Sequence, residues 1–306
     1  MIPLCAPENA KLPTALALGS FDGLHLGHKK VIKAILKEPI GVPTVVSFWP
    51  HPREVLFGES RLRLDLPNEK TFLLEPLGIE QLVLVPFNKN LASKSAETFV
   101  EEVLAKTLHA KHIAVGENFR FGRNREGDTS TLEKIGASLG IKISIVPIVK
   151  DNHGRLSSSR VRKALNEGDL KHAKYLLKRP YTFRGTVEKG RGLGKKIGWP
   201  TANLKIDGRK FLPSLGVYAA WASIANKKER FLAVMNMGPQ PTIDPNSLSA
   251  VEVHLLDKEI NLLGHELIIE PVQRIRLQKK FENIDALSEQ ISLDAILAKE
   301  ILANDL

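Results

Sequence analysis

Up to about residue 178, short apolar runs alternate along the chain with segments that are apolar at helical spacing. Apolar runs of about four to eight residues predict buried strands, and apolar positions every three to four residues predict amphipathic helices. The expected strands are Thr14–Gly19, Pro43–Phe48, Gln81–Pro86, His112–Gly116 and Ile141–Pro147. The expected helices are Leu26–Lys37, Asn68–Leu77, Ser95–His109, Thr129–Leu139 and Ser157–Leu177. This alternation favours βαβ units on a parallel sheet, which binds ligands at the carboxyl ends of its strands.

The pattern changes after Pro180. Since a proline disfavours a helical residue before it, the preceding helix is expected to end at Lys178-Arg179. The apolar runs that follow are separated by turn residues and predict strands at Tyr181–Lys189, Gly216–Ile224, Phe231–Met235, Ala250–Leu256 and Glu266–Arg276. They favour an antiparallel barrel or sandwich, with a closing helix over Ile284–Leu302. We therefore predict an α/β chain with two domains, residues 1–179 and 180–306.

Composition agrees with a globular protein of two domains. A chain of 306 residues is long for one core, and 43% hydrophobic and 25% charged residues are ordinary proportions. The one cysteine, Cys5, excludes an intramolecular disulfide and a cysteine-built metal site. No apolar run approaches the roughly 20 residues that span a bilayer, and the N-terminus lacks a signal-peptide pattern. We therefore expect a cytoplasmic protein with no membrane partner.

The net charge of +10 suits partners that are rich in phosphate. The basic residues form no dense cluster, and their longest runs are pairs such as Lys29-Lys30 and Lys195-Lys196. We therefore expect local phosphate sites for small substrates and no nucleic-acid partner. The sequence leaves the oligomeric state open.

The densest chemical signal is the segment Gly19–His28, GSFDGLHLGH, where the first expected strand meets the first helix. Backbone N–H groups at the start of a helix favour anions, and Gly27 lets a nucleotide approach the backbone closely. His25 and His28 lie on one side of a helical turn, where imidazole donors can stabilise the charge that develops as pyrophosphate leaves an α-phosphate. An isolated HxxH is more often a surface pair or part of a metal site, but the preceding strand and glycine turn favour phosphate chemistry.

A second cluster of hydroxyl and guanidinium groups lies at Arg155–Arg162, RLSSSRVR. Its three serines precede a helix, which they can cap, or they can bind phosphate. Arg155 and Arg162 flank the serines and can bind phosphate oxygens with forked donors. Alone, this pattern is typical of an N-cap with solvated arginines. Together with HxGH it predicts the other wall of a triphosphate site.

HxGH in this setting resembles the nucleotidyltransferase superfamily. GSFDGLHLGH, SFWPHPREVL, VGENFRFGRNREGD and LSSSRVRKAL occur in the order found in the N-terminal module of bacterial bifunctional riboflavin kinase/FAD synthetases. The resemblance implies a Rossmann-like nucleotidyltransferase domain in which His25 and His28 are catalytic. It also implies ATP contacts from Gly19, Phe21, Asp22, Gly27, Arg155, Ser158, Ser159 and Arg162, and flavin contacts from Phe48, Pro50, His51, Asn118 and Phe121. Ser20 and Ser159 are mild departures, because the family frequently has Asn and Thr there.

The second domain begins with a glycine-rich segment, Gly185–Asn203. Its glycines let backbone amides turn toward phosphates, and Lys195 or Lys196 adds charge. Its spacing matches neither GxxxxGK[ST] nor a dinucleotide fingerprint, and glycines alone favour a mobile hairpin loop. Thr201 and Asn203 follow a proline-fixed turn and supply hard oxygen ligands suited to magnesium.

Further along, VEVHL alternates as a strand, so Glu252 and His254 share one face. A carboxylate in a barrel can accept the proton of an attacking hydroxyl, although a solvent-facing strand is the more ordinary interpretation.

The order of GRGLGKKIGWPTAN, LGVYAAW, MNMGPQPTI and VEVHLL resembles the riboflavin kinase module. The resemblance implies an antiparallel β-barrel kinase domain with a terminal helix, in which Glu252 is the catalytic base and Arg276 lies near the flavin. It implies that Thr201 and Asn203 bind Mg²⁺–ATP, with further ATP contacts from Gly190, Gly192, Gly194 and Lys195. One departure is Leu262–Gly264, where the family often has an aromatic residue before the glycine.

The two resemblances together predict two successive transfers from ATP. The first converts riboflavin to FMN, and the second adenylates FMN to FAD with release of pyrophosphate; Mg²⁺ is the expected cofactor. An adenylyltransferase for another substrate is disfavoured by the second domain. A basic RNA-binding protein with an inactive nucleotidyltransferase fold is disfavoured by the intact site residues. A redox flavoprotein that holds its flavin tightly is the remaining alternative.

Overall fold

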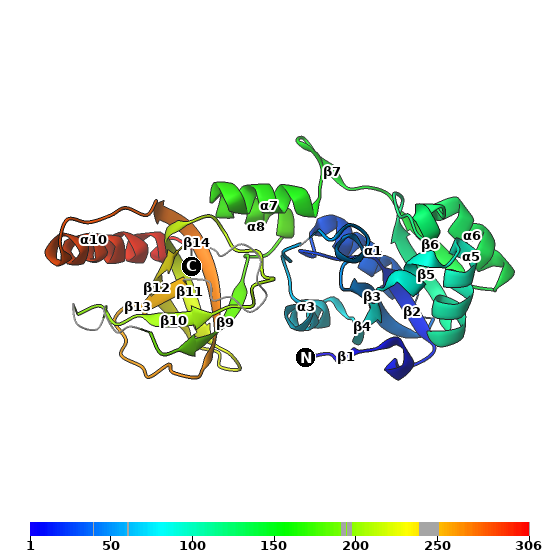
Figure 1. Ribbon diagram of the computed structural model, residues 1–306, viewed down its shortest axis with the longest axis horizontal. Coiled ribbons are helices and arrows are strands. Elements are labelled where there is room, and N and C mark those ends of the chain that lie inside the picture. Colours follow the sequence, from blue (N-terminus) through cyan, green and yellow to red (C-terminus); the bar gives the residue numbers. More distant parts are fainter. Residues whose placement is uncertain (39, 60, 191–193, 195–197, 239–250, 306) are drawn as a thin grey trace. The chain divides into compact units, whose positions relative to one another are not determined.

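The computed structural model describes residues 1–306 except 39, 60, 191–193, 195–197, 239–250 and 306 (Figure 1). The chain folds into two compact units. The first contains Met1–Arg61 and Asp65–Ser158, and the second contains Leu62–Leu64 and Ser159–Leu306. The predicted boundary between residues 179 and 180 stays a prediction that a fragment can test.

The first unit is built on a six-stranded parallel sheet with the order β1-β4-β3-β2-β5-β6. Its strands are β1 (Leu4–Cys5), β2 (Thr14–Leu18), β3 (Val42–Trp49), β4 (Gln81–Pro86), β5 (Ala110–Gly116) and β6 (Lys142–Val146). The predicted strands are present, and β1 is an additional short edge strand. The order reverses at β2, which has β3 on one side and β5 on the other. Ligands bind outside the carboxyl ends of strands at such a point, which favours the segments after β2 and β5.

Helices cover both faces of this sheet (Figure 1). They are α1 (Leu26–Leu36), α2 (Pro52–Phe57), α3 (Pro67–Leu74), α4 (Lys89–Ser93), α5 (Ala96–Thr98) and α6 (Thr129–Ser138). The core beneath α1 and α3 includes Ala15 and Ala17 of β2. The core beneath α6 and the π-helical segment Phe99–Thr107 includes Leu16 and Leu18. Alternate residues of one strand therefore enter opposite cores, as the two-residue repeat of a strand requires.

The second unit contains a closed antiparallel barrel with the order β10-β13-β12-β11-β14-β9. Its strands are β9 (Phe183–Glu188), β10 (Ala202–Lys205), β11 (Gly216–Ile224), β12 (Arg230–Met237), β13 (Val251–Leu255) and β14 (Glu266–Arg276). Helices α7 (Ser158–Glu167) and α8 (Leu170–Leu177) precede the barrel in sequence. The barrel alternative is thus the correct one, and β10 is a strand that the apolar pattern did not predict.

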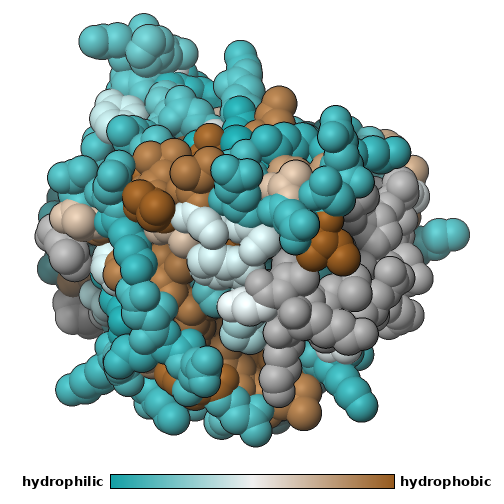
Figure 2. All heavy atoms as spheres, turned by 90° about the vertical axis from the view of Figure 1, so that its left-hand side faces the viewer, coloured by the Kyte–Doolittle hydropathy of each residue, from teal (hydrophilic) through white to brown (hydrophobic). Residues whose placement is uncertain are grey.

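The last helix, α10 (Ile284–Ala303), covers part of the outer face of the barrel (Figure 1). Ala295, Ala298 and Leu302 pack against a core that includes Val217 and Ala219 of β11. Other apolar side chains of α10 stay exposed: Ile284, Leu293, Ile296 and Leu297. Figure 2, which views the molecule from this side, shows apolar side chains lying among charged ones.

A short segment from early in the sequence, Leu62–Leu64, belongs to the second unit. The backbone N–H of Arg63 donates to Arg209 at 2.7 Å, and the N–H of Phe211 donates to Arg63 at 2.7 Å. The ammonium of Lys210, a fully buried side chain, donates to the carbonyls of Leu64 at 2.6 Å and Thr182 at 3.0 Å. The sequence does not predict this pairing, because a segment of three residues is too short to show a repeat of apolar positions.

Candidate active sites

The first candidate site begins in the turn between β2 and α1. Phe21, Gly23 and Leu24 have φ values of 46°, 88° and 44°, so the turn passes three times through the left-handed region. His25 is the N-cap residue of α1, and His28 lies in its first turn. Their imidazole rings stack with centroids 3.7 Å apart and planes inclined by 19°. The predicted same-side pairing of these two histidines is therefore observed.

Both imidazoles are held in the neutral form. Burial, and then the charge of Arg155, lowers the pKa of His25 from 6.5 to about 4, although Asp22 opposes the shift. Burial, followed by His25, Lys70 and Arg155, lowers the pKa of His28 well below its usual value. The Nδ1 atom of each ring is buried and has no hydrogen-bond partner among the described residues. Two neutral rings with unused ring nitrogens can donate hydrogen bonds to phosphate oxygens.

Close packing explains the residue types around this pair. An ideal Cβ on Gly27 would stand 3.1 Å from Cε1 of His25, so a side chain there would press on the ring. A Cβ on Gly19 would stand 3.3 Å from the ring of Phe21. Phe21 is buried and meets His28 edge-on at 5.4 Å. Gly19, Phe21 and Gly27 thus shape the turn, and their predicted contacts with ATP stay predictions.

Other predicted ATP residues lie next to this turn. The hydroxyl of Ser158, at the start of α7, donates to the carbonyl of Asp22 at 2.7 Å. Arg155 lies on the short strand β8 (Gly154–Arg155), and with the amide suitably oriented, its guanidinium donates to the Asn118 oxygen at 3.0 and 3.3 Å. Asn118 follows β5 and the turn follows β2, which are the two strands at the reversal of sheet order.

Ser159 and Arg162 belong to the second unit. Ser159 is exposed, and Arg162 donates to the carbonyl of Leu62 at 3.2 Å while its guanidinium lies 5.7 Å from the ring centroid of Phe211. Their predicted contacts with ATP stay predictions.

The predicted flavin residues of the first unit lie in a cluster of aromatic rings. Phe121 is buried and stacks on Phe119 at 5.4 Å, and Phe48 meets Phe87 edge-on at 5.8 Å. His51 is the N-cap residue of α2: its ring accepts from the N–H of Arg53 at 3.1 Å. Phe121 and His51 therefore have structural roles, and Phe48 and Pro50 lie in the strand end and loop before α2. Flavin contacts by these four residues stay predictions.

The second candidate site follows from the register of the barrel strands. Asn203 on β10 lies opposite Glu188 on β9 and Glu252 on β13, and Glu252 lies opposite Asn236 on β12. These residues form a polar row that the alternation of Val251 and Val253 places on the outer face. The carboxylate of Glu252 is half-buried and makes no hydrogen bond or ion pair with the described residues. A carboxylate with unused oxygens beside two amides can accept a proton from a substrate.

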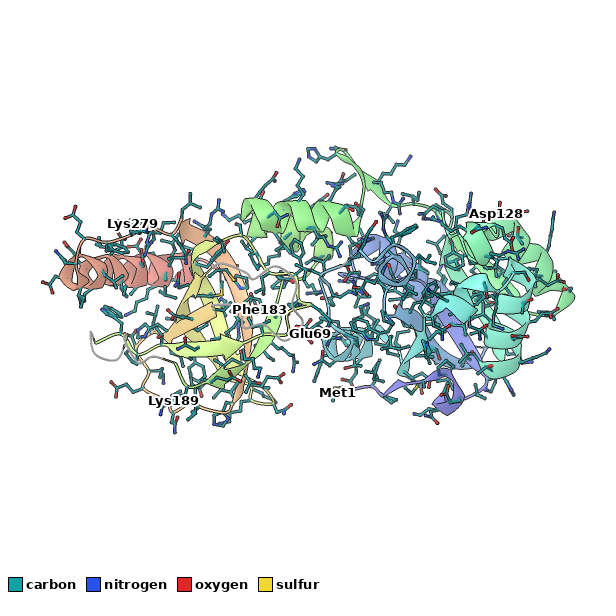
Figure 3. All side chains as sticks on the ribbon, in the orientation of Figure 1. Met1, Glu69, Asp128, Phe183, Lys189 and Lys279 are labelled. Atoms are coloured by element: carbon teal, nitrogen blue, oxygen red, sulfur yellow. The ribbon has the colours of Figure 1, made fainter. Side chains whose placement is uncertain are left out.

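Two glycines lie against the predicted magnesium ligands. Both belong to the glycine-rich segment Gly185–Asn203 and come after Lys189, which Figure 3 labels and which directly follows β9. A Cβ on Gly190 would stand 2.0 Å from Nδ2 of Asn203. A Cβ on Gly194 would stand 2.2 Å from the carbonyl oxygen of Trp199 and 3.2 Å from Oγ1 of Thr201. The backbone at both glycines therefore approaches the two predicted ligands without an intervening side chain. Gly192 and Lys195 lie outside the described residues.

His254 holds the turn that carries Thr201, a role that the sequence did not reveal. Its Nδ1 donates to the carbonyl of Pro200 at 2.7 Å, and its ring meets Trp199 edge-on at 5.1 Å. Trp199 in turn donates to the hydroxyl of Ser288 on α10 at 3.3 Å. The alternation of VEVHL placed His254 beside Glu252, but its acceptor, the Pro200 carbonyl, lies in the turn before β10 and has no signal in the sequence.

Arg276 is engaged with α10. Its guanidinium donates to both oxygens of Asp294, at distances from 2.7 to 3.0 Å, and lies 5.6 Å from the ring centroid of Phe281. Asp294 is 2% exposed, so this ion pair is largely desolvated. Arg276 thus joins β14 to α10, and its predicted flavin contact stays a prediction.

The structure defines a two-unit transferase. One unit has a neutral histidine pair at a helix N-terminus, and the other has a barrel with a half-buried carboxylate, Glu252, that makes no hydrogen bond or ion pair with the described residues. The family model described as FAD synthetase matches residues 8–160, and the model described as riboflavin kinase matches residues 177–302. The bifunctional riboflavin kinase/FMN adenylyltransferase of Haemophilus influenzae is 35% identical over 295 residues, covering 93% of both chains. That of Bacillus subtilis is 35% identical over 300 residues, covering 95% of this chain and 92% of the relative.

The chain belongs to the family of bifunctional riboflavin kinases/FMN adenylyltransferases. The predicted fold class and the predicted pair of activities, formation of FMN from riboflavin and of FAD from FMN, are confirmed by these matches.

The fold also resembles a solved structure along nearly its whole length. The crystal structure of a macrolide-efflux protein from Streptococcus pneumoniae has a TM-score of 0.82 and 29% sequence identity, covering 97% of this chain and 98% of that one. Among the described residues, no helix has both the length and the apolar character needed to cross a membrane.

Proposed function

We propose that the two activities belong to separate sites, one in each unit. The stacked pair His25 and His28 carries adenylyl transfer, and Glu252 carries phosphoryl transfer. The observation that carries this proposal is the separation of the two groups: the histidines belong to the first unit and Glu252 belongs to the second. Among the described residues, the Nδ1 atoms of both histidines and the carboxylate of Glu252 also have no hydrogen-bond partner, as a binding site for substrate requires.

In the adenylyl transfer, a phosphate oxygen of FMN attacks the α-phosphate of ATP, and pyrophosphate leaves. The N–H groups of His25 and His28 stabilise the charge that develops on the phosphate oxygens, together with Arg155. The stacked rings favour this neutral donor role because two cations 3.7 Å apart would repel each other. The step needs positioning and charge stabilisation but no covalent enzyme intermediate.

In the kinase reaction, the 5′-hydroxyl of riboflavin attacks the γ-phosphate of ATP. Glu252 accepts the hydroxyl proton as the new phosphate ester bond forms, while the bond between the γ-phosphorus and the β–γ bridging oxygen breaks and ADP leaves. Asn203 and Asn236 flank Glu252 in the row and orient the substrate beside it.

Mg²⁺ is the cofactor that these residues suit. Thr201 and Asn203 present hydroxyl and amide oxygens, which are ligands that hard cations prefer, and Gly190 and Gly194 let the backbone lie close to both side chains. Bound by Thr201 and Asn203, Mg²⁺ would neutralise negative charge on the ATP phosphates. Riboflavin, FMN and ATP are the proposed partners, without nucleic acid or membrane, and the proposed location is the cytoplasm.

A pair of substitutions in the full chain tests the separation. His28→Ala should abolish formation of FAD from FMN and leave formation of FMN from riboflavin largely intact. Glu252→Gln keeps size and hydrogen bonding but removes the base, so it should lower FMN formation by about 10²–10⁴-fold and spare FAD formation from supplied FMN. Products are separated by chromatography from one preparation of each variant. Loss of both activities in either folded variant would refute separate sites.

A further inference from the structure

Lys70 is a buried lysine that the proposed mechanism does not use. It lies on α3 next to Glu69, which Figure 3 labels, and its residue is 6% exposed. A buried ammonium is costly unless polar groups surround it. Its Nζ donates to the carbonyl of Ser20 at 2.9 Å. Ser20 lies in the turn that leads to His25 and His28, so this lysine acts on the backbone that positions both rings.

The contacts around Ser20 hold an unusual piece of backbone. The hydroxyl of Ser47, at the end of β3, also donates to the Ser20 carbonyl at 3.2 Å. The next residue, Phe21, has a φ of 46°, a conformation that costs an ordinary residue about 1–2 kcal/mol. Such conformations persist when surrounding contacts over-determine them. The donors from α3 and β3 supply contacts of this kind.

The neighbouring turn residue is fixed in the same way. The carbonyl of Asp22 accepts from Ser158 at 2.7 Å, and one of its carboxylate oxygens accepts from the N–H of Asp65 at 3.4 Å. Asp65 lies two residues before the start of α3, which carries Lys70. Lys70 on α3 and Asp65 just before it therefore contact two residues of the histidine-bearing turn, Ser20 and Asp22.

We propose that Lys70 is a positioning residue for adenylyl transfer, which fixes the Ser20 carbonyl and so sets the geometry of the His25–His28 pair. The inference rests on the proposed role of these histidines. The positive charge of Lys70 is also one of the causes, after burial and His25, that keep the pKa of His28 low. The other charged group that acts on His28 is Arg155.

The test compares substitutions that separate the hydrogen bond from Lys70 to the Ser20 carbonyl from the positive charge of Lys70. Lys70→Met removes both, Lys70→Gln removes the charge and keeps a donor, and Lys70→Arg keeps both. Lys33→Met removes the charge of an exposed lysine on α1 and serves as the matched control. Each full-length variant is assayed for FAD from FMN and for FMN from riboflavin. The kinase activity reports folding of the second unit, and thermal unfolding of each variant checks that the first unit, which contains Lys70, is folded.

We expect Lys70→Met to lower kcat for FAD formation by about 10–100-fold, the effect typical of misplacing a catalytic group by about 1 Å. Formation of FMN should be unchanged, and Lys70→Arg and Lys33→Met should stay within about threefold of the parent, since neither removes a positioning contact. In an NMR titration of labelled histidine, the pKa of His28 should rise in Lys70→Met and Lys70→Gln but not in Lys33→Met. A purely structural role would lower the stability without moving this pKa in folded protein.

The proposal fails if folded Lys70→Met keeps normal FAD formation or leaves the pKa of His28 unchanged. If Lys70→Met does not fold, Lys70→Gln decides. Because it keeps a donor but not the charge, its kcat should stay near that of the parent while the pKa of His28 rises; an unchanged pKa of His28, or a kcat that is lower by about tenfold or more, refutes the proposal. These results differ from those expected if His25 and His28 do not carry adenylyl transfer. If the histidines have no such role, His28→Ala itself would retain FAD formation, whatever the Lys70 variants do.

Discussion

A single methyl group at Gly190 should disable the kinase and leave the adenylyltransferase intact. An ideal Cβ at this position would stand 2.0 Å from Nδ2 and 2.6 Å from Cγ of Asn203. Ordinary contacts between non-bonded heavy atoms lie near 3.5–4.0 Å, so the Asn203 side chain must move by at least about 1 Å. Since Asn203 is a proposed magnesium ligand beside Glu252, a displacement of this size should lower kcat for FMN formation by about 10²-fold.

Gly264→Ala is the matched control for this substitution. Gly264 has a φ of 79° and no neighbouring atom within 4 Å of an added Cβ, so alanine is strained there but displaces nothing. The control should therefore lose stability, by about 1–2 kcal/mol, and keep its kcat. Gly190 has no such φ, so Gly190→Ala should show the reverse: a lower kcat with little change in melting temperature.

The assay measures FMN from riboflavin and FAD from supplied FMN on the same preparation, together with thermal unfolding. A kcat for Gly190→Ala equal to that of the parent would refute the reasoning, because it would mean that the Asn203 position is not needed for phosphoryl transfer. Equal loss of both activities would instead indicate misfolding.

Two further predictions concern stability. Because the pKa of His25 is about 4 in the fold and 6.5 ordinarily, the unfolded chain binds more protons in this window. Acidification from pH 6.5 to 4 should therefore reduce the unfolding free energy by up to about 3 kcal/mol, and His25→Gln should remove that part of the slope. A fragment of residues 181–306 should fold and make FMN, but it lacks the Leu64 carbonyl that Lys210 uses. Denaturant unfolding should show the fragment to be stabilised by Lys210→Met, although the same change destabilises the full chain; the opposite result would contradict this.

The apolar pattern predicts the fold well where an element has a clear repeat. Buried strands such as β2 and β4 are continuous apolar runs, because helices cover both faces of a parallel sheet. It misses β10, because Ala202–Lys205 is a short strand with an asparagine in it. It also cannot predict that Leu62–Leu64 joins the second unit, since that depends on the partners of Lys210 rather than on any repeat.

The candidate sites divide along the same line. Some site residues are placed by the local structure of their own segment, as His25 is at the N-terminus of α1. These residues are recognisable from the order of strand, glycine turn and helix. Residues that act through a partner distant in sequence are not, and Lys70 and His254 are of this kind. Each donates to a carbonyl in a turn some 50 residues away: the separations are 50 for Lys70–Ser20 and 54 for His254–Pro200.

The turns at Ser20 and Pro200 show why a site needs donors such as Lys70 and His254 in addition to its catalytic residues. A turn that must keep ring nitrogens or hard oxygens available to phosphate cannot use those same atoms to hold itself in place. Its stability then depends on its remaining polar groups, the backbone carbonyls, which accept from Lys70 and Ser47 at Ser20 and from His254 at Pro200. Substituting the donor should therefore change catalysis with no change in the groups that contact substrate, whereas substituting His28 or Glu252 removes those groups directly.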